Sequence, residues 1–166
     1  MVKKLAIVAI SSLTGYVLGT IGTVKRLNSK KRKMQMLSDK HEALFMLMNQ
    51  WVKVKQAGKG IAGYLEHKDY KKIAIYGMGY AGETLVRELY NSNIQIEYGI
   101  DREADNINAE FKVVKPDAQL EKADVLIVTS ITFFDEIVTD LCGKIDCPII
   151  SLEDILYEVG SGDVKF

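Results

Sequence analysis

The fold is decided by residues 71–89, which read KKIAIYGMGYAGETLVREL. A short apolar run, Ile73 to Tyr76, precedes a glycine-rich turn, and Leu85, Val86 and Leu89 then recur at the spacing of one helix face. The turn therefore lies between a predicted strand and a predicted helix, which is the setting in which such a motif holds a phosphate. We predict a nucleotide phosphate site at this turn.

Each glycine of the turn has its own expected role. Gly77 allows the sharp turn, Gly79 allows the backbone to approach a pyrophosphate, and Gly82 allows the helix to pack closely on the strand. The helix N-terminus would offer free N–H groups and a positive dipole to the phosphate. The alternative is a tight turn that binds no ligand. The predicted loop site consists of Gly77, Met78, Gly79, Tyr80, Ala81 and Gly82.

A second strand is predicted from Ile94 to Ile100, and Asp101 follows it where a ribose-binding acid belongs. Asp101 would bind ribose hydroxyls and repel a 2′-phosphate, which favours NAD or a nucleoside diphosphate over NADP. The adjacent Arg102 could reverse that preference. Both residues could also form an ordinary polar strand end.

Three further strands are predicted at Phe111–Val114, Ala123–Thr129 and Pro148–Ile150, with helices at Phe133–Leu141 and Leu152–Val159. Strands that alternate with helices predict an α/β fold, a Rossmann-like parallel sheet of about five strands. A ligand should bind at the switch point between the first and fourth strands. Polar residues at the end of the fourth strand could contact a sugar or second phosphate, or cap a helix. These are Thr129, Ser130 and Thr132.

The N-terminal segment from Leu5 to Val24 has about 20 residues without charge, enough to cross a bilayer as a helix. A transmembrane helix is the prediction, with a cleaved signal peptide as the alternative. Six Lys and Arg residues at 25–33 outweigh Lys3 and Lys4, so the following domain should face the cytoplasm. The same basic cluster could rest on anionic lipid. Gly15 and Gly19 have the spacing of a homodimer contact.

An amphipathic connecting helix is predicted between Ser38 and Gly58. Asp39 and Glu42 resemble a capping box that would begin it, and glycines would end it. Its apolar stripe would cover the sheet, or else bind a partner helix. A short helix should follow at Gly60–Leu65. The stripe consists of Leu37, Leu44, Phe45, Met48, Trp51 and Val52.

The chain thus divides into an anchor and basic segment at 1–33, a helical connector at 34–70 and a nucleotide-binding domain at 71–166. Residues 1–33 contain no Asp or Glu and eight of the 22 Lys and Arg residues, which leaves 14 basic and 22 acidic residues after them. An acidic domain argues against nucleic-acid binding.

No catalytic or metal-binding group is predicted. Cys142 and Cys147 lack the second pair of a zinc site and should be reduced, buried thiols. Tyr64 and Lys68 have the Y-x-x-x-K spacing of short-chain oxidoreductases, but they precede the first strand, so we interpret the spacing as coincidence.

The run Ile75 to Gly82 together with Gly99-Ile100-Asp101 resembles the membrane-tethered Rossmann domain of bacterial polysaccharide-biosynthesis proteins of the nucleotide-sugar dehydratase and epimerase kind. Val125 to Ser130 and Ile150 to Ile155 fit the later part of that domain. The similarity covers roughly Lys71 to Leu156. The catalytic domain of those enzymes, with its tyrosine and lysine, has no counterpart in this sequence.

The resemblance implies a membrane-anchored protein that binds a nucleotide or nucleotide sugar and acts as an accessory or sensor in envelope polysaccharide synthesis. A second hypothesis is an NAD-dependent epimerase or dehydratase that a partner subunit completes. A third is a degenerate Rossmann module for protein contacts. The residues do not decide among NAD, a nucleotide sugar, CoA and S-adenosylmethionine.

Overall fold

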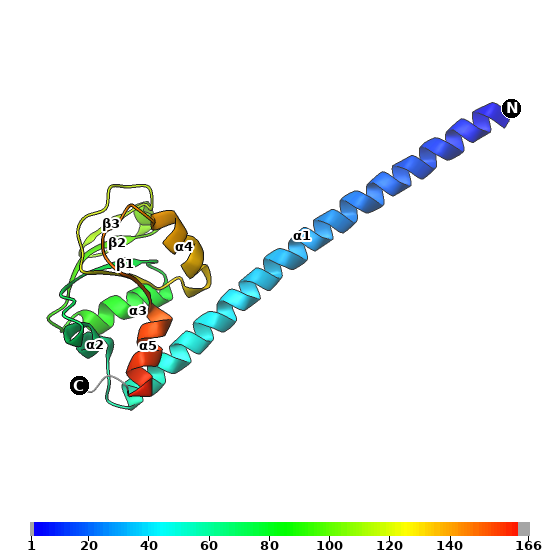
Figure 1. Ribbon diagram of the computed structural model, residues 1–166. Coiled ribbons are helices and arrows are strands. Elements are labelled where there is room, and N and C mark those ends of the chain that lie inside the picture. The colour runs from blue at the N-terminus through cyan, green and yellow to red at the C-terminus, as the bar shows by residue number, and fades with distance from the viewer. Residues whose placement is uncertain (1, 163–166) are drawn as a thin grey trace. The chain divides into compact units, whose positions relative to one another are not determined.

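The computed structural model describes the backbone of residues 2–162 and the side chains of residues 23–162. The chain forms two units, residues 1–42 and 43–166. Its elements are shown in Figure 1. They are α1 (Val2–Gln56), α2 (Ile61–His67), β1 (Lys72–Tyr76), α3 (Tyr80–Leu89), β2 (Gln95–Ile100), the 3₁₀ turn η1 (Ala104–Asn106), β3 (Lys112–Val114), β4 (Val125–Val128), the 3₁₀ turn η2 (Ile131–Phe133), α4 (Phe134–Leu141), β5 (Ile149–Ser151) and α5 (Leu152–Ser161).

The five strands form one parallel sheet in the order β3-β2-β1-β4-β5. This order places β1 beside β4, so the chain reverses direction across the sheet at the predicted switch point. The α/β class, the parallel sheet and the Rossmann-like order are therefore confirmed. One irregularity interrupts the register: Ile73 pairs with Ile96 and Ala74 with Tyr98, which leaves Glu97 as an extra residue.

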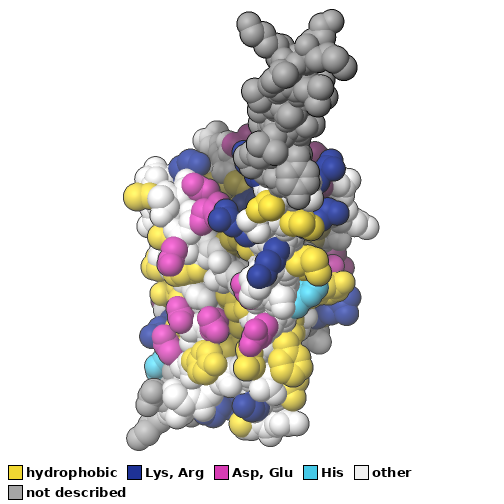
Figure 2. All heavy atoms as spheres, turned by 90° about the vertical axis from the view of Figure 1, so that its right-hand side faces the viewer, with side chains coloured by type: hydrophobic (Ala, Val, Ile, Leu, Met, Phe, Trp, Pro, Cys, Tyr) yellow, Lys and Arg dark blue, Asp and Glu magenta, His cyan; other side chains and the backbone are white. Residues whose placement is uncertain are grey.

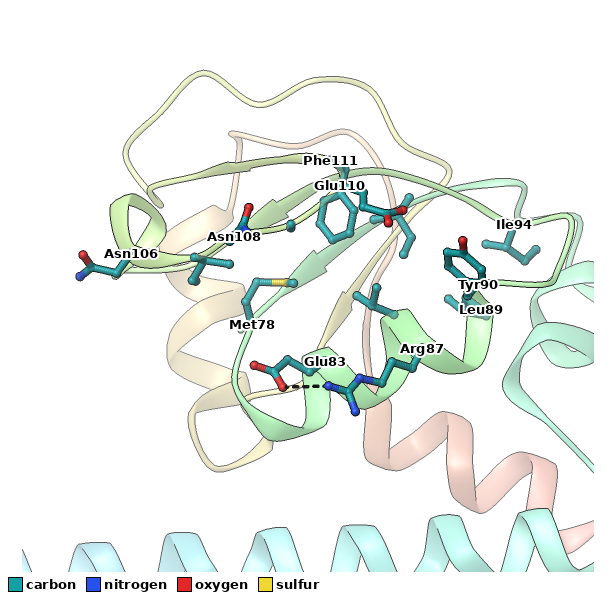
Figure 3. Close-up of a pocket in the computed structure, with 14 residues that line it drawn as sticks. Met78, Glu83, Arg87, Leu89, Tyr90, Ile94, Asn106, Asn108, Glu110 and Phe111 are labelled. Atoms are coloured by element: carbon teal, nitrogen blue, oxygen red, sulfur yellow. Dashed lines mark ion pairs between the residues drawn. The ribbon is translucent and has the colours of Figure 1, made fainter.

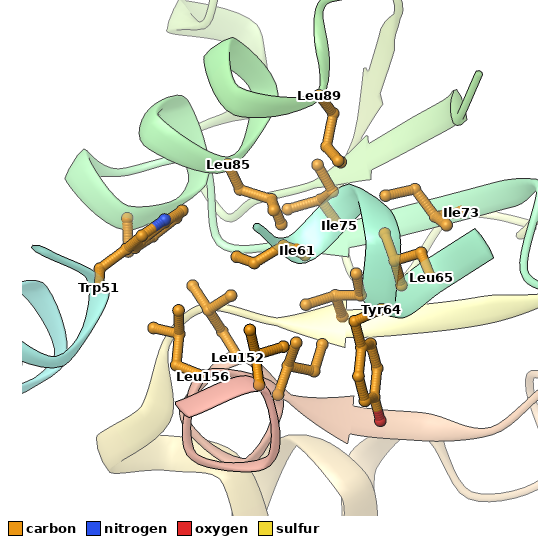
Figure 4. Close-up of a cluster of buried hydrophobic side chains, with 14 of the residues drawn as sticks. Trp51, Ile61, Tyr64, Leu65, Ile73, Ile75, Leu85, Leu89, Leu152 and Leu156 are labelled. Carbon is orange, nitrogen blue, oxygen red and sulfur yellow. The ribbon is translucent and has the colours of Figure 1, made fainter. Parts of the chain in front are cut away.

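The two faces of the sheet have separate cores because strand side chains alternate in direction. Ile73, Ile75, Val125 and Ile127 point to the face covered by α2, α3, α5 and the end of α1. Figure 4 shows this cluster. Ala74, Tyr76, Leu126 and Val128 belong to the cluster on the other face, which α4 covers with Ile137 and Leu141.

The connecting helix differs from the prediction at its start. Helix α1 runs without interruption through Asp39 and Glu42, so these residues are exposed mid-helix positions and the predicted capping box is wrong. The residues around them are Lys, Arg, Met, Gln and Leu, which favour helix, and no glycine or proline breaks the segment. Its predicted end is confirmed, since Gly58 has φ +72° just after α1.

The buried face of α1 is also rotated from the predicted stripe. Leu47, Trp51 and Val54 are buried, whereas Phe45 and Val52 are 69% and 53% exposed. Two sets of apolar residues with helical spacing lie on this segment, and the sequence pattern alone does not show which set is buried. Most of the predicted stripe therefore lies at the margin of the core or outside it.

The predicted membrane span, Leu5 to Val24, lies mostly within residues 1–22, whose side chains are outside the described residues. In the part of the chain that the structure describes, no helix has an apolar stretch long enough to cross a membrane.

A single carboxylate joins three helices of the larger unit. The Glu88 side chain on α3 is only 8% exposed. It accepts hydrogen bonds from the indole N–H of Trp51 on α1 and from the backbone N–H of Ile61 at the start of α2, the latter at 2.8 Å. Lys55 lies 3.4 Å from the same carboxylate. The charge of Glu88 is thus compensated where it is buried.

Replacing Glu88 with alanine should lower the free energy of unfolding by about 3 kcal/mol, because two donors lose a charged acceptor. Glu83→Ala on the same helix is the control. Its carboxylate is 59% exposed and 4.0 Å from Arg87, so its loss should cost less than about 1 kcal/mol. Urea unfolding followed by circular dichroism measures both. Equal losses in the two variants would contradict a joining role for Glu88.

Candidate functional site

Gly77 begins the turn in a conformation that other residues rarely adopt. Its φ is +94°, and its backbone N–H donates to the carbonyl of Ile100 at 2.8 Å. A Cβ at this position would lie 2.4 Å from the Ser130 hydroxyl oxygen and 2.8 Å from that of Thr129. The predicted role of Gly77 in a sharp turn therefore has two physical causes, backbone conformation and lack of space.

Gly82 brings the first turn of α3 against the glycine turn itself. A Cβ on Gly82 would lie 2.1 Å from the carbonyl oxygen of Gly77. No rotation of a side chain relieves such a contact, because the obstructing atom belongs to the backbone. This is the close packing of helix on strand that the sequence predicts for the third glycine.

Gly79 differs from the other two glycines. It precedes α3 with φ −78°, which any residue adopts, and a Cβ built on it would meet no atom within 4 Å. The absence of a side chain at Gly79 is thus not required by contacts among the described residues. It leaves open space in front of the N-terminus of α3.

Four backbone N–H groups lie at this opening without a hydrogen-bond partner among the described residues. They are those of Gly79, Tyr80, Ala81 and Gly82. The first N–H groups of a helix have no acceptor within it and carry the positive end of its dipole. Tyr80 is 78% exposed and the space in front of Gly79 is open, whereas Ala81 and Gly82 are buried. The arrangement can accept an anionic oxygen.

The amide of Met78 is not available in the same way. It donates to Asp101 Oδ2 at 2.7 Å, and Asp101 Oδ1 accepts from the N–H of Glu103 at 2.9 Å. Asp101 thus lies beside the turn, as predicted, and each of its carboxylate oxygens accepts a hydrogen bond from a backbone N–H group. Each carboxylate oxygen can still accept a second hydrogen bond. Met78 is 7% exposed, and its side chain lies against Gly99, as does the ring of Phe111.

The two predicted residues at the end of β4 meet the turn from the other side. Thr129 is buried, and its hydroxyl donates to the carbonyls of Gly77 at 2.6 Å and Tyr76 at 3.1 Å. Its role in the structure is to hold the turn. Ser130 is half-buried next to Gly77, and its hydroxyl has no partner among the described residues.

Arg102 extends from the end of β2 toward α4. Its guanidinium lies 3.9 Å from Glu136, and both side chains are more than half exposed. The glycine turn, Asp101 and Ser130 therefore come together at the carboxyl ends of β1, β2 and β4, while the charge of Arg102 is partly offset by an acidic neighbour on α4.

A groove lies beside α3 and over the β2–β3 side of the sheet. It measures about 920 Å³ and adjoins the turn through Met78. Figure 3 shows Asn106 and Asn108 at one end, Tyr90 and Ile94 at the other, and Arg87 paired with Glu83 along α3. The connection between β2 and β3 contains only η1 and no full helix, so this part of the sheet is incompletely covered. The groove was not predicted from the sequence, because it results from the lack of a helix between β2 and β3.

Other residues considered in the sequence lie away from this site. Tyr64 is buried in the core, and burial together with Glu158 raises its pKa to about 12, the opposite of what acid/base catalysis by a tyrosine requires. Cys142 is exposed, so its predicted burial is wrong; it follows the last residue of α4. Cys147 is half-buried, and burial raises its thiol pKa. Among residues 23–162, no group of three potential ligand side chains could hold a metal ion.

The two helix-side glycines should respond differently to alanine. Gly82→Ala should lower the free energy of unfolding by about 3 kcal/mol, because its Cβ collides with the Gly77 carbonyl. Gly79→Ala should cost less than about 1 kcal/mol, since space is open there. Urea unfolding of both variants measures the difference. A larger loss for Gly79→Ala would contradict the geometry of the turn.

Comparison with known proteins adds no relative: no family profile, curated protein or solved structure matches this chain significantly. The Rossmann-like fold rests on the strand order and on the glycine turn at the switch point.

Proposed function

We propose that the α/β unit binds a nucleotide through its phosphate at the N-terminus of α3. The observation that carries this proposal concerns Gly79. No contact among the described residues requires glycine at this position, and the open space that it leaves lies before four N–H groups without a partner among those residues. Such a position is what a phosphate needs, because its oxygens approach the backbone closely and are held by amides and the helix dipole.

The neighbouring side chains suit the sugar of a nucleotide. Asp101 retains acceptor capacity beside the turn, and the Ser130 hydroxyl is unpartnered among the described residues. Arg102 lies near Glu136, which weakens it as a receptor for a 2′-phosphate. These contacts favour NAD or a nucleotide sugar over NADP.

The cellular role belongs to the same proposal. We place the protein at the membrane through residues 5–24, with the nucleotide-binding domain in the cytoplasm, where it serves envelope polysaccharide synthesis as an accessory or sensor. The support is the uncharged N-terminal run, the basic residues that follow it and the resemblance of the glycine motif.

A module used only for protein contacts is the second candidate. One observation favours it: the turn is stabilised within the chain, since Asp101 and Thr129 both use their side chains to hold its backbone. A turn of this kind keeps its shape without a ligand, so a ligand-binding measurement is needed to separate the two functions.

The full chain should be heated with NAD, NADP, UDP-sugars, CoA and S-adenosylmethionine in turn. A ligand at 100 times its dissociation constant should stabilise the fold by roughly 2.7 kcal/mol and raise the melting temperature. Gly79→Glu should abolish the rise, because its carboxylate occupies the phosphate position while its Cβ fits the fold.

Asn91→Glu is the matched control, since it adds the same charge just past the other end of α3, at an exposed residue. It should keep the ligand-induced rise. No rise with any of the five classes, or a rise that Gly79→Glu leaves intact, would reject the phosphate site and favour the protein-contact module.

A further inference from the structure

The segment of α1 from residue 23 to residue 38 carries a strong positive charge. It contains six basic residues and no acidic one. All of its side chains are exposed. None of the six has an ion-pair partner among the described residues. The six, called here the basic band, are Lys25, Arg26, Lys30, Lys31, Arg32 and Lys33.

The basic band surrounds the helix instead of forming one face. Successive residues of an α-helix are about 100° apart, so these six positions leave no sector wider than about 100° without a cation. Along the axis the band is only about 12 Å long, at 1.5 Å per residue. A short ring of charge of this kind fits a planar layer of anions that the helix passes through, whereas a helix lying flat on a surface needs its cations on one side.

Exposed apolar side chains adjoin the basic band at both ends. Val24 before the band is 54% exposed, and Met34 and Leu37 after it are 73% and 54% exposed, while Leu27 within the band is 60% exposed. Figure 2 shows basic and hydrophobic side chains next to one another on the face it presents. Long basic side chains can direct their charged ends toward water while their stems cover apolar surface.

We infer that the basic band binds the headgroup layer of an anionic lipid bilayer. Phosphate headgroups offer the layer of negative charge that the ring of cations fits, and each Lys or Arg near such a surface contributes to binding. Nucleic acid fits less well, because a duplex would contact the helix along one side and leave the cations on the other sides without a phosphate. The inference rests on the membrane placement proposed above and is independent of whether the glycine turn binds a nucleotide.

The test uses the full chain and flotation with vesicles of phosphatidylcholine, alone or with 30 mol% phosphatidylglycerol. The lipid concentration is kept low enough to leave half of the protein unbound. Partitioning should favour the anionic vesicles and weaken as salt is raised from 50 to 300 mM. Lys30→Gln, Lys31→Gln and Lys33→Gln combined should reduce partitioning to anionic vesicles on the order of a hundredfold.

The matched control removes three exposed lysines elsewhere that also have no ion-pair partner among the described residues: Lys53→Gln, Lys122→Gln and Lys144→Gln. It should bind as the unmodified chain does. Equal binding to both kinds of vesicle would overturn the inference and leave the proposed anchor at residues 5–24 in place, whereas no binding to either would overturn both. Tighter binding to a DNA or RNA duplex at the same salt would also overturn it and assign the basic band to nucleic acid.

Discussion

The larger unit depends on the contact between the first turn of α3 and the carbonyl of Gly77. The absence of a side chain at Gly82 lets the helix rest directly on the turn, and Thr129 fixes that carbonyl from β4. Strand β1, helix α3 and strand β4 are thereby held at one point of the chain. The same contact fixes the first turn of α3, whose N–H groups have no partner among the described residues, so a packing constraint and a potential anion site have one cause.

The strands and most of the helices could be predicted because their signals are local. The apolar runs of the sheet and the glycine turn are contiguous in sequence, and the observed strands agree with the predictions within two residues at either end. The choice between two faces of α1 could not be predicted, since Phe45 and Val52 have the same helical spacing as Leu47 and Val54. Tertiary packing, which the pattern does not contain, selects the buried line.

At the candidate site, the sequence predicted which residues lie near the turn better than it predicted which hydrogen bonds they make. The position of Asp101 beside the turn follows from the length of α3 and β2, but its hydrogen bond to Met78 depends on how the turn folds back. Likewise Thr129 has the sequence position of a ligand contact or a cap, yet its hydroxyl serves the turn. Glu88 gave no signal, because its partners Trp51 and Ile61 lie 37 and 27 residues away in the chain.

The Glu88 contact has an optical consequence. Trp51 is the only tryptophan in the sequence. Its indole donates to the carboxylate of Glu88 near the end of α3, and the other end of α3 faces the glycine turn. Indole emission depends on local polarity and on the charge next to the ring, so the tryptophan fluorescence of this protein originates at one junction, between α1 and α3. A displacement of α3 would therefore change the emission without any added label, and the chain carries its own reporter for the movement of that helix.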